Sequence, residues 1–130
     1  NFNSQFFLVS PPELRIREEA LMDLEGKVKI SHHEEVEEVI GEVDVLYVTR
    51  IQKERFPDPV EYEKVKGSYV IDNQLLSKGQ DGLMVMHPLP RTTEIKPEVD
   101  ATPYAKYFIQ TRYGKIVRAA LISLILNEEL

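Results

Sequence analysis

Residues 43–48, which read VDVLYV, decide the fold that this sequence predicts. The stretch is short and rich in β-branched residues, and it is continuously apolar from 45 to 48, which is typical of a strand covered on both faces. Polar and charged residues follow at once in TRIQKER, residues 49–55. We therefore predict a central strand whose carboxyl end leads directly into a polar segment.

Similar patterns lie on both sides of this strand and alternate between strand and helix. The predicted strands cover residues 6–9, 28–30, 43–48, 69–71 and 83–86. The predicted helices cover residues 11–24, 32–40 and 73–78. Ser10 and Ser31 precede the first two helices at capping-box spacing, and a glycine follows each helix. This alternation predicts an α/β fold: a single domain over residues 1–130, built as a three-layer sandwich with a mostly parallel, doubly wound sheet of about five strands.

The composition excludes several classes of protein. Of the 130 residues, 16 are basic and 22 are acidic, and the net charge of −6 argues against nucleic acid or an anionic membrane as the main partner. No apolar run approaches the roughly 20 residues of a membrane span and no signal segment is recognisable, so a cytoplasmic location is expected. The absence of cysteine excludes disulfides, thiolate metal sites and cysteine nucleophiles. A start at Asn1 rather than Met suggests a piece of a longer chain.

Two segments do not fit simple α/β packing. Residues 88–103 contain four prolines, and a loop this long inside a domain is often functional. Residues 115–127, KIVRAALISLILN, are apolar on nearly every side of a helical wheel. A helix that is apolar all round is normally buried on all sides, so we expect this one to dock against another domain or subunit absent from this chain.

The residues that could do chemistry follow two of the predicted strands. TRIQKER follows the strand at 43–48, and HPLPR (87–91) follows the strand at 83–86. Ligands of parallel α/β sheets bind beyond the carboxyl ends of the strands. Both segments therefore open onto one crevice if these two strands are neighbours.

In the first segment, Arg50 and Gln52 share one face if the chain is extended. A guanidinium can bind a carboxylate through two parallel hydrogen bonds, Lys53 adds a positive charge, and Glu54 could orient Arg50. On composition alone, a solvated, charge-mixed helix start is the more common interpretation of such a run. The position directly after a strand makes a carboxylate-binding site more plausible, but the solvated helix start stays the more common interpretation.

In the second segment, Pro88 and Pro90 flank Leu89. The prolines remove two N–H donors and stiffen the backbone while leaving carbonyl oxygens free, so the segment could present these oxygens to the amino group of a ligand. A rigid turn at the end of an edge strand explains the prolines equally well. We expect His87 to be structural rather than catalytic.

No other motif supports a different chemistry. The run HHEE (residues 32–35) resembles a metal site, but adjacent residues at a helix start point apart, so a solvated turn is the better interpretation and no metal ion is predicted. Glycine-rich dinucleotide and phosphate loops, HExxH and GxSxG are all absent from the sequence.

Four motifs make the sequence similar to a known family. They are DVLYVTRIQKERF (44–56), MHPLPR (86–91), EVD..P.A.YF.Q (98–110) and G.IVR.AL (114–121). In this order and spacing they resemble the C-terminal, aspartate-binding half of aspartate carbamoyltransferase catalytic chains. Ornithine carbamoyltransferases typically have Cys where this sequence has Pro88, and they lack the TR.QKER run.

The resemblance implies transfer of a carbamoyl group from carbamoyl phosphate to the amino group of L-aspartate in pyrimidine synthesis, with no metal or organic cofactor. In the family a preceding half binds carbamoyl phosphate, and full-length chains form catalytic trimers, sometimes with regulatory chains. We therefore expect no complete catalytic set here and no activity of this chain alone. Two alternatives stay open: a carbamoyltransferase for another amino acid, or a non-catalytic interaction module on the same scaffold.

The resemblance also implies roles for individual residues. Arg50 and Gln52 would bind the side-chain carboxylate of aspartate. The carbonyls of Pro88 and Leu89 would face the reacting amino group and the carbamoyl amide. Supporting positions, in the adjoining turns, in a loop that closes over substrate or on the last helix, are Lys53, Glu54, Arg55, Tyr62, His87, Arg91 and Arg118. The sequence departs from the family pattern, in places that affect loop closure or domain docking, at Thr93, Tyr113 and an extra residue near Pro57.

Overall fold

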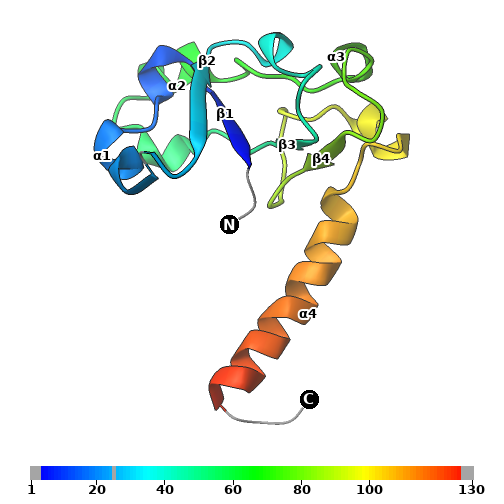
Figure 1. Cartoon of the computed structure of the whole chain (residues 1–130). Coiled ribbons are helices and arrows are strands. Elements are labelled where there is room, and N and C mark those ends of the chain that lie inside the picture. Colours follow the sequence, from blue (N-terminus) through cyan, green and yellow to red (C-terminus); the bar gives the residue numbers. More distant parts are fainter. Residues whose placement is uncertain (1–3, 25, 127–130) are drawn as a thin grey trace.

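The computed structural model describes residues 4–24 and 26–126, and within them the strands pair in parallel (Figure 1). β1 (Gln5–Val9) pairs with β2 (Lys29–His33), and β3 (Val45–Tyr47) pairs with β4 (Met84–Met86). Parallel pairing brings the carboxyl ends of neighbouring strands to the same edge. The predicted α/β class and parallel pairing are confirmed.

Short helices and turns connect the strands. The α-helices are α1 (Glu18–Leu21), α2 (Pro59–Val65), α3 (Asn73–Leu76) and α4 (Tyr107–Leu126). Turns of 3-10 helix are η1 (Pro12–Leu14), η2 (Met22–Leu24), η3 (Val36–Glu38), η4 (Lys53–Arg55) and η5 (Pro97–Ala101). Aspartates cap α2 and α3, the two α-helices between β3 and β4. Asp58 accepts from the Val60 N–H at 2.8 Å, and Asp72 accepts from the Leu75 N–H at 2.9 Å.

The hydrophobic core surrounds β4. Val85 of β4, Leu76 of α3 and Val99 of η5 have no exposed surface. Two isolated parallel bridges, Ile71 with Ile95 and Val85 with Ala105, extend the pairing beyond the named strands. This half of the molecule therefore has the most buried framework, and the residues that follow β4 leave from it.

The first two predicted helices are largely wrong. The segment 11–24 is broken into η1, α1 and η2, and the apolar residues Ile16 and Met22 remain exposed. A short helix that buries little has little to hold it together. Ser31 lies within β2 rather than at a helix cap, and only the turn η3 follows, where Glu38 Oε1 accepts the Glu35 N–H at 3.0 Å.

Three further expectations differ from the structure. The predicted strand 69–71 is reduced to the single bridge at Ile71. The strand at 43–48 is not covered on both faces, since Val45 and Tyr47 are 41% and 54% exposed. Figure 1 shows α4 leading away from the sheet, so this helix does not cover the strand.

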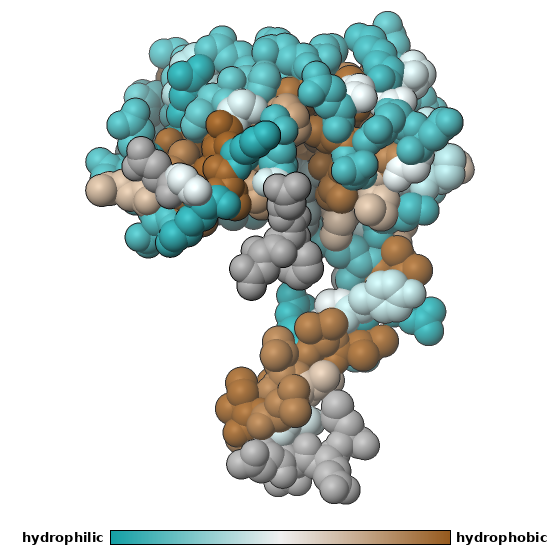
Figure 2. Space-filling view, in the orientation of Figure 1, coloured by the Kyte–Doolittle hydropathy of each residue, from teal (hydrophilic) through white to brown (hydrophobic). Residues whose placement is uncertain are grey.

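The helix α4 begins at Tyr107, well before the predicted start at Lys115. Its second half exposes apolar side chains to the surroundings, seen as the brown lower part of Figure 2. These exposed residues are Ile116, Val117, Leu121, Ile122, Leu124, Ile125 and Leu126. The predicted end at Asn127, like the chain start at Asn1, lies outside the described residues. No helix in the described ranges combines the length and apolarity that crossing a membrane requires.

Candidate functional site

The segments after β3 and β4 leave the sheet side by side. Tyr47 is paired with Met86, and the Val48 N–H donates to the Met86 carbonyl at 2.9 Å. The condition that the two strands be neighbours is therefore met. Residues 49–55 and 87–91 start at the same edge, where ligands of parallel sheets bind.

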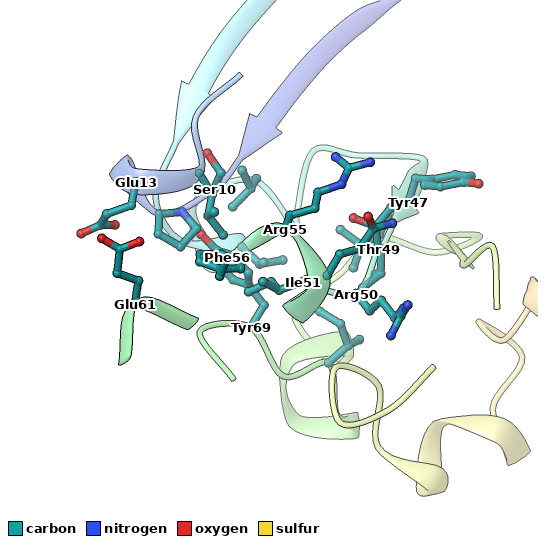
Figure 3. Close-up of a pocket in the computed structure, with 18 of the residues that line it drawn as sticks. Ser10, Glu13, Tyr47, Thr49, Arg50, Ile51, Arg55, Phe56, Glu61 and Tyr69 are labelled. Atoms are coloured by element: carbon teal, nitrogen blue, oxygen red, sulfur yellow. The ribbon is translucent and has the colours of Figure 1, made fainter. Parts of the chain in front are cut away.

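A cavity of about 730 Å³ lies between the segment after β1 and the segment after β3 (Figure 3). Arg50, Gln52 and Arg55 line it together with Ser10 and Tyr69. Arg50 and Arg55 leave the backbone in different directions, so they offer two separate cationic groups (Figure 3). Pro88 and Leu89 do not line this cavity, and neither does Arg118, which is exposed on α4.

Arg50 is half-buried and is held by Glu54. Its Nη2 donates at 2.8 Å to Oε1 of Glu54, four residues further along the chain. The pKa of Glu54 is lowered by the hydrogen bond from its own backbone N–H and then by that from Arg50, so the carboxyl group is ionised. Glu54 binds only Nη2 of Arg50, so the other N–H groups of the guanidinium can donate to an anion.

The segment that follows Arg50 folds back on itself through aromatic contacts. The Lys53 ammonium lies 5.8 Å from the centroid of the Tyr62 ring, and Phe56 meets Tyr62 edge-on at 5.7 Å. Tyr62 also lines a small cavity with Thr93, so the threonine that departs from the family pattern lies close to this segment. Lys53, Glu54 and Arg55 are all exposed.

The turn after β4 is built around buried His87. Its Nε2 lies 2.8 Å from Glu94 Oε1, and its Nδ1 accepts the Leu89 N–H at 2.8 Å. Leu89 has a positive φ of 52°, and its bond to Pro90 is cis. The His87 backbone N–H donates to Gln110 Oε1 at 3.0 Å, which ties the turn to the first turns of α4.

A second network fixes the end of the same turn. Arg91 forms a two-pronged ion pair with Asp100 and donates to the Tyr107 hydroxyl at 3.0 Å, while that hydroxyl donates to Asp100 at 2.5 Å. Hydrogen bonds from Arg91 and then Tyr107 lower the pKa of Asp100. Burial, followed by the bond to Asp100, raises the pKa of Tyr107 to about 12. Asp100 is thus the anion of the network, and Arg91 is its cation.

Sequence reasoning missed the partners that hold this turn: Glu94, Asp100, Tyr107 and Gln110. Three of them lie in the motif EVD..P.A.YF.Q. This motif indicated the family, but it did not indicate which residues contact the turn. The run HHEE also acquires neighbours that the sequence did not indicate, because His33 contacts Glu38 and Ser31. No cluster of three metal-ligating side chains occurs in residues 4–24 or 26–126.

The fold and the site together define a parallel α/β domain with an arginine-lined cavity at the carboxyl ends of its strands, which is where ligands of such sheets bind. Comparison with known families gives a narrower assignment. The family model described as "Aspartate/ornithine carbamoyltransferase, Asp/Orn binding domain" matches residues 1–125. The chain belongs to this family.

Individual relatives agree with the assignment. The aspartate carbamoyltransferase catalytic subunits of Cenarchaeum symbiosum and Pyrobaculum calidifontis are 52% and 55% identical over 128 residues, which cover 98% of this chain and 41% and 42% of theirs. The catalytic subunit of M. jannaschii aspartate transcarbamoylase matches with a TM-score of 0.81 and 48% identity, over 93% of this chain and 40% of that chain. The chain thus spans about two fifths of the length of these relatives.

A second similar structure is aspartate transcarbamoylase from Trypanosoma cruzi in complex with carbamoyl phosphate and aspartate. The TM-score is 0.84 at 36% identity, over 94% of this chain and 41% of that chain.

Proposed function

We propose that this chain is the L-aspartate-binding half of an aspartate carbamoyltransferase catalytic chain. The observation that carries the proposal is half-buried Arg50, held by ionised Glu54 at an otherwise open cavity that Gln52 also lines. Such an arginine binds a carboxylate through two parallel hydrogen bonds, and Glu54 keeps it oriented. Gln52 adds a neutral amide donor beside it.

The reaction needs orientation more than chemical groups. The amino nitrogen of aspartate forms a bond to the carbonyl carbon of carbamoyl phosphate, and the bond from that carbon to the phosphate oxygen breaks. The proton that the amino group loses goes to the departing phosphate. Arg50 and Gln52 hold the side-chain carboxylate, while the carbonyls of Pro88 and Leu89 accept hydrogen bonds from the reacting groups. Fixing both reactants in this way lowers the entropic part of the barrier. No metal or organic cofactor takes part.

Charge favours aspartate over ornithine as the amino acid. The guanidinium groups of Arg50 and Arg55 line the cavity, and they would repel the ammonium group of an ornithine side chain. A non-catalytic interaction module on this scaffold remains the alternative from another class.

The rest of the site belongs to a carbamoyl phosphate-binding half outside this sequence, consistent with the two fifths of the relatives that this chain spans. The exposed apolar part of α4 and Arg118 on it are the surface that would meet that half. The lone chain then has no turnover, and the complete enzyme assembles as catalytic trimers in the cytoplasm.

The finer architecture follows the same proposal. Val9 of β1 packs on the core that contains Val48, and the ends of β1 and β3 line one cavity. With the bridge from Val85 to Ala105, this supports one doubly wound sheet of five strands in the order β2, β1, β3, β4 and the segment at 105. Hydrogen-exchange protection and cross-strand NOEs between β1 and β3 would test it; their absence would leave two separate sheets.

The function is tested by titrating the isotope-labelled chain with succinate and aspartate. We expect shifts in the amides of residues 50–52 and 89, and Arg50→Ala should weaken binding at least about 30-fold because a charge-assisted, two-pronged contact is lost. Arg112→Ala, an exposed arginine on α4, is the matched control and should bind normally. Unmoved amides with wild-type chain would overturn the proposal, and self-association through α4 would then favour the interaction module.

A further inference from the structure

The buried ring of His87 accepts a hydrogen bond from the N–H of the Pro88–Leu89 peptide. We infer that His87 is a positioning residue, which holds this peptide so that the Pro88 and Leu89 carbonyls face the reacting amino group, and that Glu94 fixes the ring in the form able to do so. The inference rests on the proposed function. It adds two residues to the machinery that do not touch substrate themselves.

The contacts dictate the protonation of the ring. The Leu89 backbone N–H can donate but not accept, so His87 Nδ1, 2.8 Å away, must carry no hydrogen. Burial raises the pKa of Glu94, but hydrogen bonds from its own backbone and from the Thr92 hydroxyl and N–H outweigh burial and lower it. The ionised carboxylate only accepts, so the hydrogen between Glu94 Oε1 and His87 Nε2 belongs to the ring. His87 is thus the neutral tautomer with hydrogen on Nε2.

Glu94 is itself fixed in place. Thr92 donates its hydroxyl to Glu94 Oε2 at 2.8 Å and its backbone N–H to the same oxygen at 3.1 Å. Both His87 and Glu94 are buried, so water does not compete strongly for these bonds. A carboxylate that orients an imidazole through its far nitrogen sets which nitrogen is left to accept.

Peptide geometry links the ring to the carbonyl. The Pro88–Leu89 bond is not among the cis bonds of the described chain, so its C=O and N–H point in opposite directions within one plane. With the Leu89 N–H pointing to the buried ring, the Pro88 carbonyl points away from it, and Pro88 is exposed. Leu89 also has φ of 52°, a conformation that residues other than glycine rarely adopt without such a restraint.

The experiment uses two variants that separate the two ends of the ring. In His87→Asn, the side-chain oxygen can replace Nδ1 as acceptor for Leu89. In His87→Gln, the amide can replace the Nε2 contact to Glu94 but leaves Leu89 without its acceptor. His32→Gln and His32→Asn, at an exposed histidine, are the matched controls.

The expected results differ by variant and by ligand. Aspartate has an amino group to meet the carbonyls and succinate has none. His87→Gln should therefore weaken aspartate binding about tenfold while succinate binding changes less than about twofold. His87→Asn should retain most aspartate affinity, and the controls should retain all of it. Equal loss for both ligands, or no loss with His87→Gln, would overturn the inference.

A measurement on the unmodified chain does not depend on any variant folding. The nitrogen shifts of His87 should show Nε2 protonated and Nδ1 unprotonated near neutral pH, and the Leu89 amide should exchange slowly. The opposite tautomer or a fast-exchanging Leu89 amide would overturn the inference whether or not ligands bind. Failure of the wild-type chain to bind either ligand would instead count against the proposed function.

Discussion

The segment after β3 and the turn after β4 border the same edge of the sheet but are held in different ways. The turn from His87 to Arg91 is held by buried or partly buried partners from the loop before η5, from η5 itself and from α4. The segment around Arg50 is held by an exposed ion pair and by aromatic contacts within itself. The turn after β4 is thus the fixed side of this edge, and the segment around Arg50, which is held mainly by its own residues, is the adaptable side.

The largest difference should appear in hydrogen exchange. The Leu89 N–H is bonded to a buried ring, whereas the Arg55 N–H is bonded to the Gln52 carbonyl in an exposed turn. We expect Leu89 to exchange at least about 100-fold more slowly after correction for intrinsic rates. Similar protection at the two amides would remove the distinction between a fixed and an adaptable side.

Removing one hydroxyl should weaken the fixed side measurably. Tyr107→Phe leaves Asp100 and Arg91 without a shared partner in a partly buried network, and should lower the free energy of unfolding by about 1–2 kcal/mol in urea denaturation. Tyr113→Phe removes a hydroxyl from a side chain that is 56% exposed, and should cost less than about 0.5 kcal/mol. Equal losses of unfolding free energy in the two variants would show that the Tyr107 hydroxyl adds no stability through this network.

Acid should weaken the fixed side next. Asp100 and Glu94 have folded pKa values below their ordinary 3.8 and 4.5. As pH falls, the unfolded chain therefore takes up protons before the folded one does. The stability that the two carboxylates contribute is complete above their ordinary pKa values and is lost as pH falls through their folded pKa values. Urea midpoints between about pH 6 and pH 3 should fall, and Asp100→Asn should reduce the slope. An unchanged slope in the variant would exclude Asp100 as a source.

The smallest effect is expected on the adaptable side. Glu54→Gln removes the charge that pairs with Arg50, but Glu54 is exposed and Arg50 is only half-buried, so the urea midpoint near neutral pH should stay within experimental error. Asp100→Asn is the matched carboxylate-to-amide change on the fixed side and should lower the urea midpoint. A loss of stability in Glu54→Gln as large as in Asp100→Asn would contradict the comparison.

The sequence predicted the features that depend on local pattern. The strands around 6–9, 28–30 and 83–86 and the segments that follow β3 and β4 could be located because apolar runs and the polar residues after them are adjacent in the chain. The helices at 11–24 and 32–40 failed because capping signals describe how a helix begins, not whether it buries enough surface to persist.

The parts of the site that could not be predicted depend on distant neighbours. His87 contacts Glu94 further along the same loop, and Gln110 of α4 binds the His87 backbone N–H. Residue type and spacing do not encode such contacts. The proposed role of Arg50 could be inferred from sequence because it needs few partners.

The helix α4 joins these two kinds of region mechanically. It has 20 residues, so at a rise of about 1.5 Å each it is about 30 Å long. Tyr107 and Gln110 fasten one end to the turn after β4, and the other end is unattached to the described body. A tilt of about 5° at the fastened end therefore moves the far end by about 2.6 Å. The helix is a lever arm, and a partner bound to its apolar end exerts a torque on the turn that carries Pro88 and Leu89.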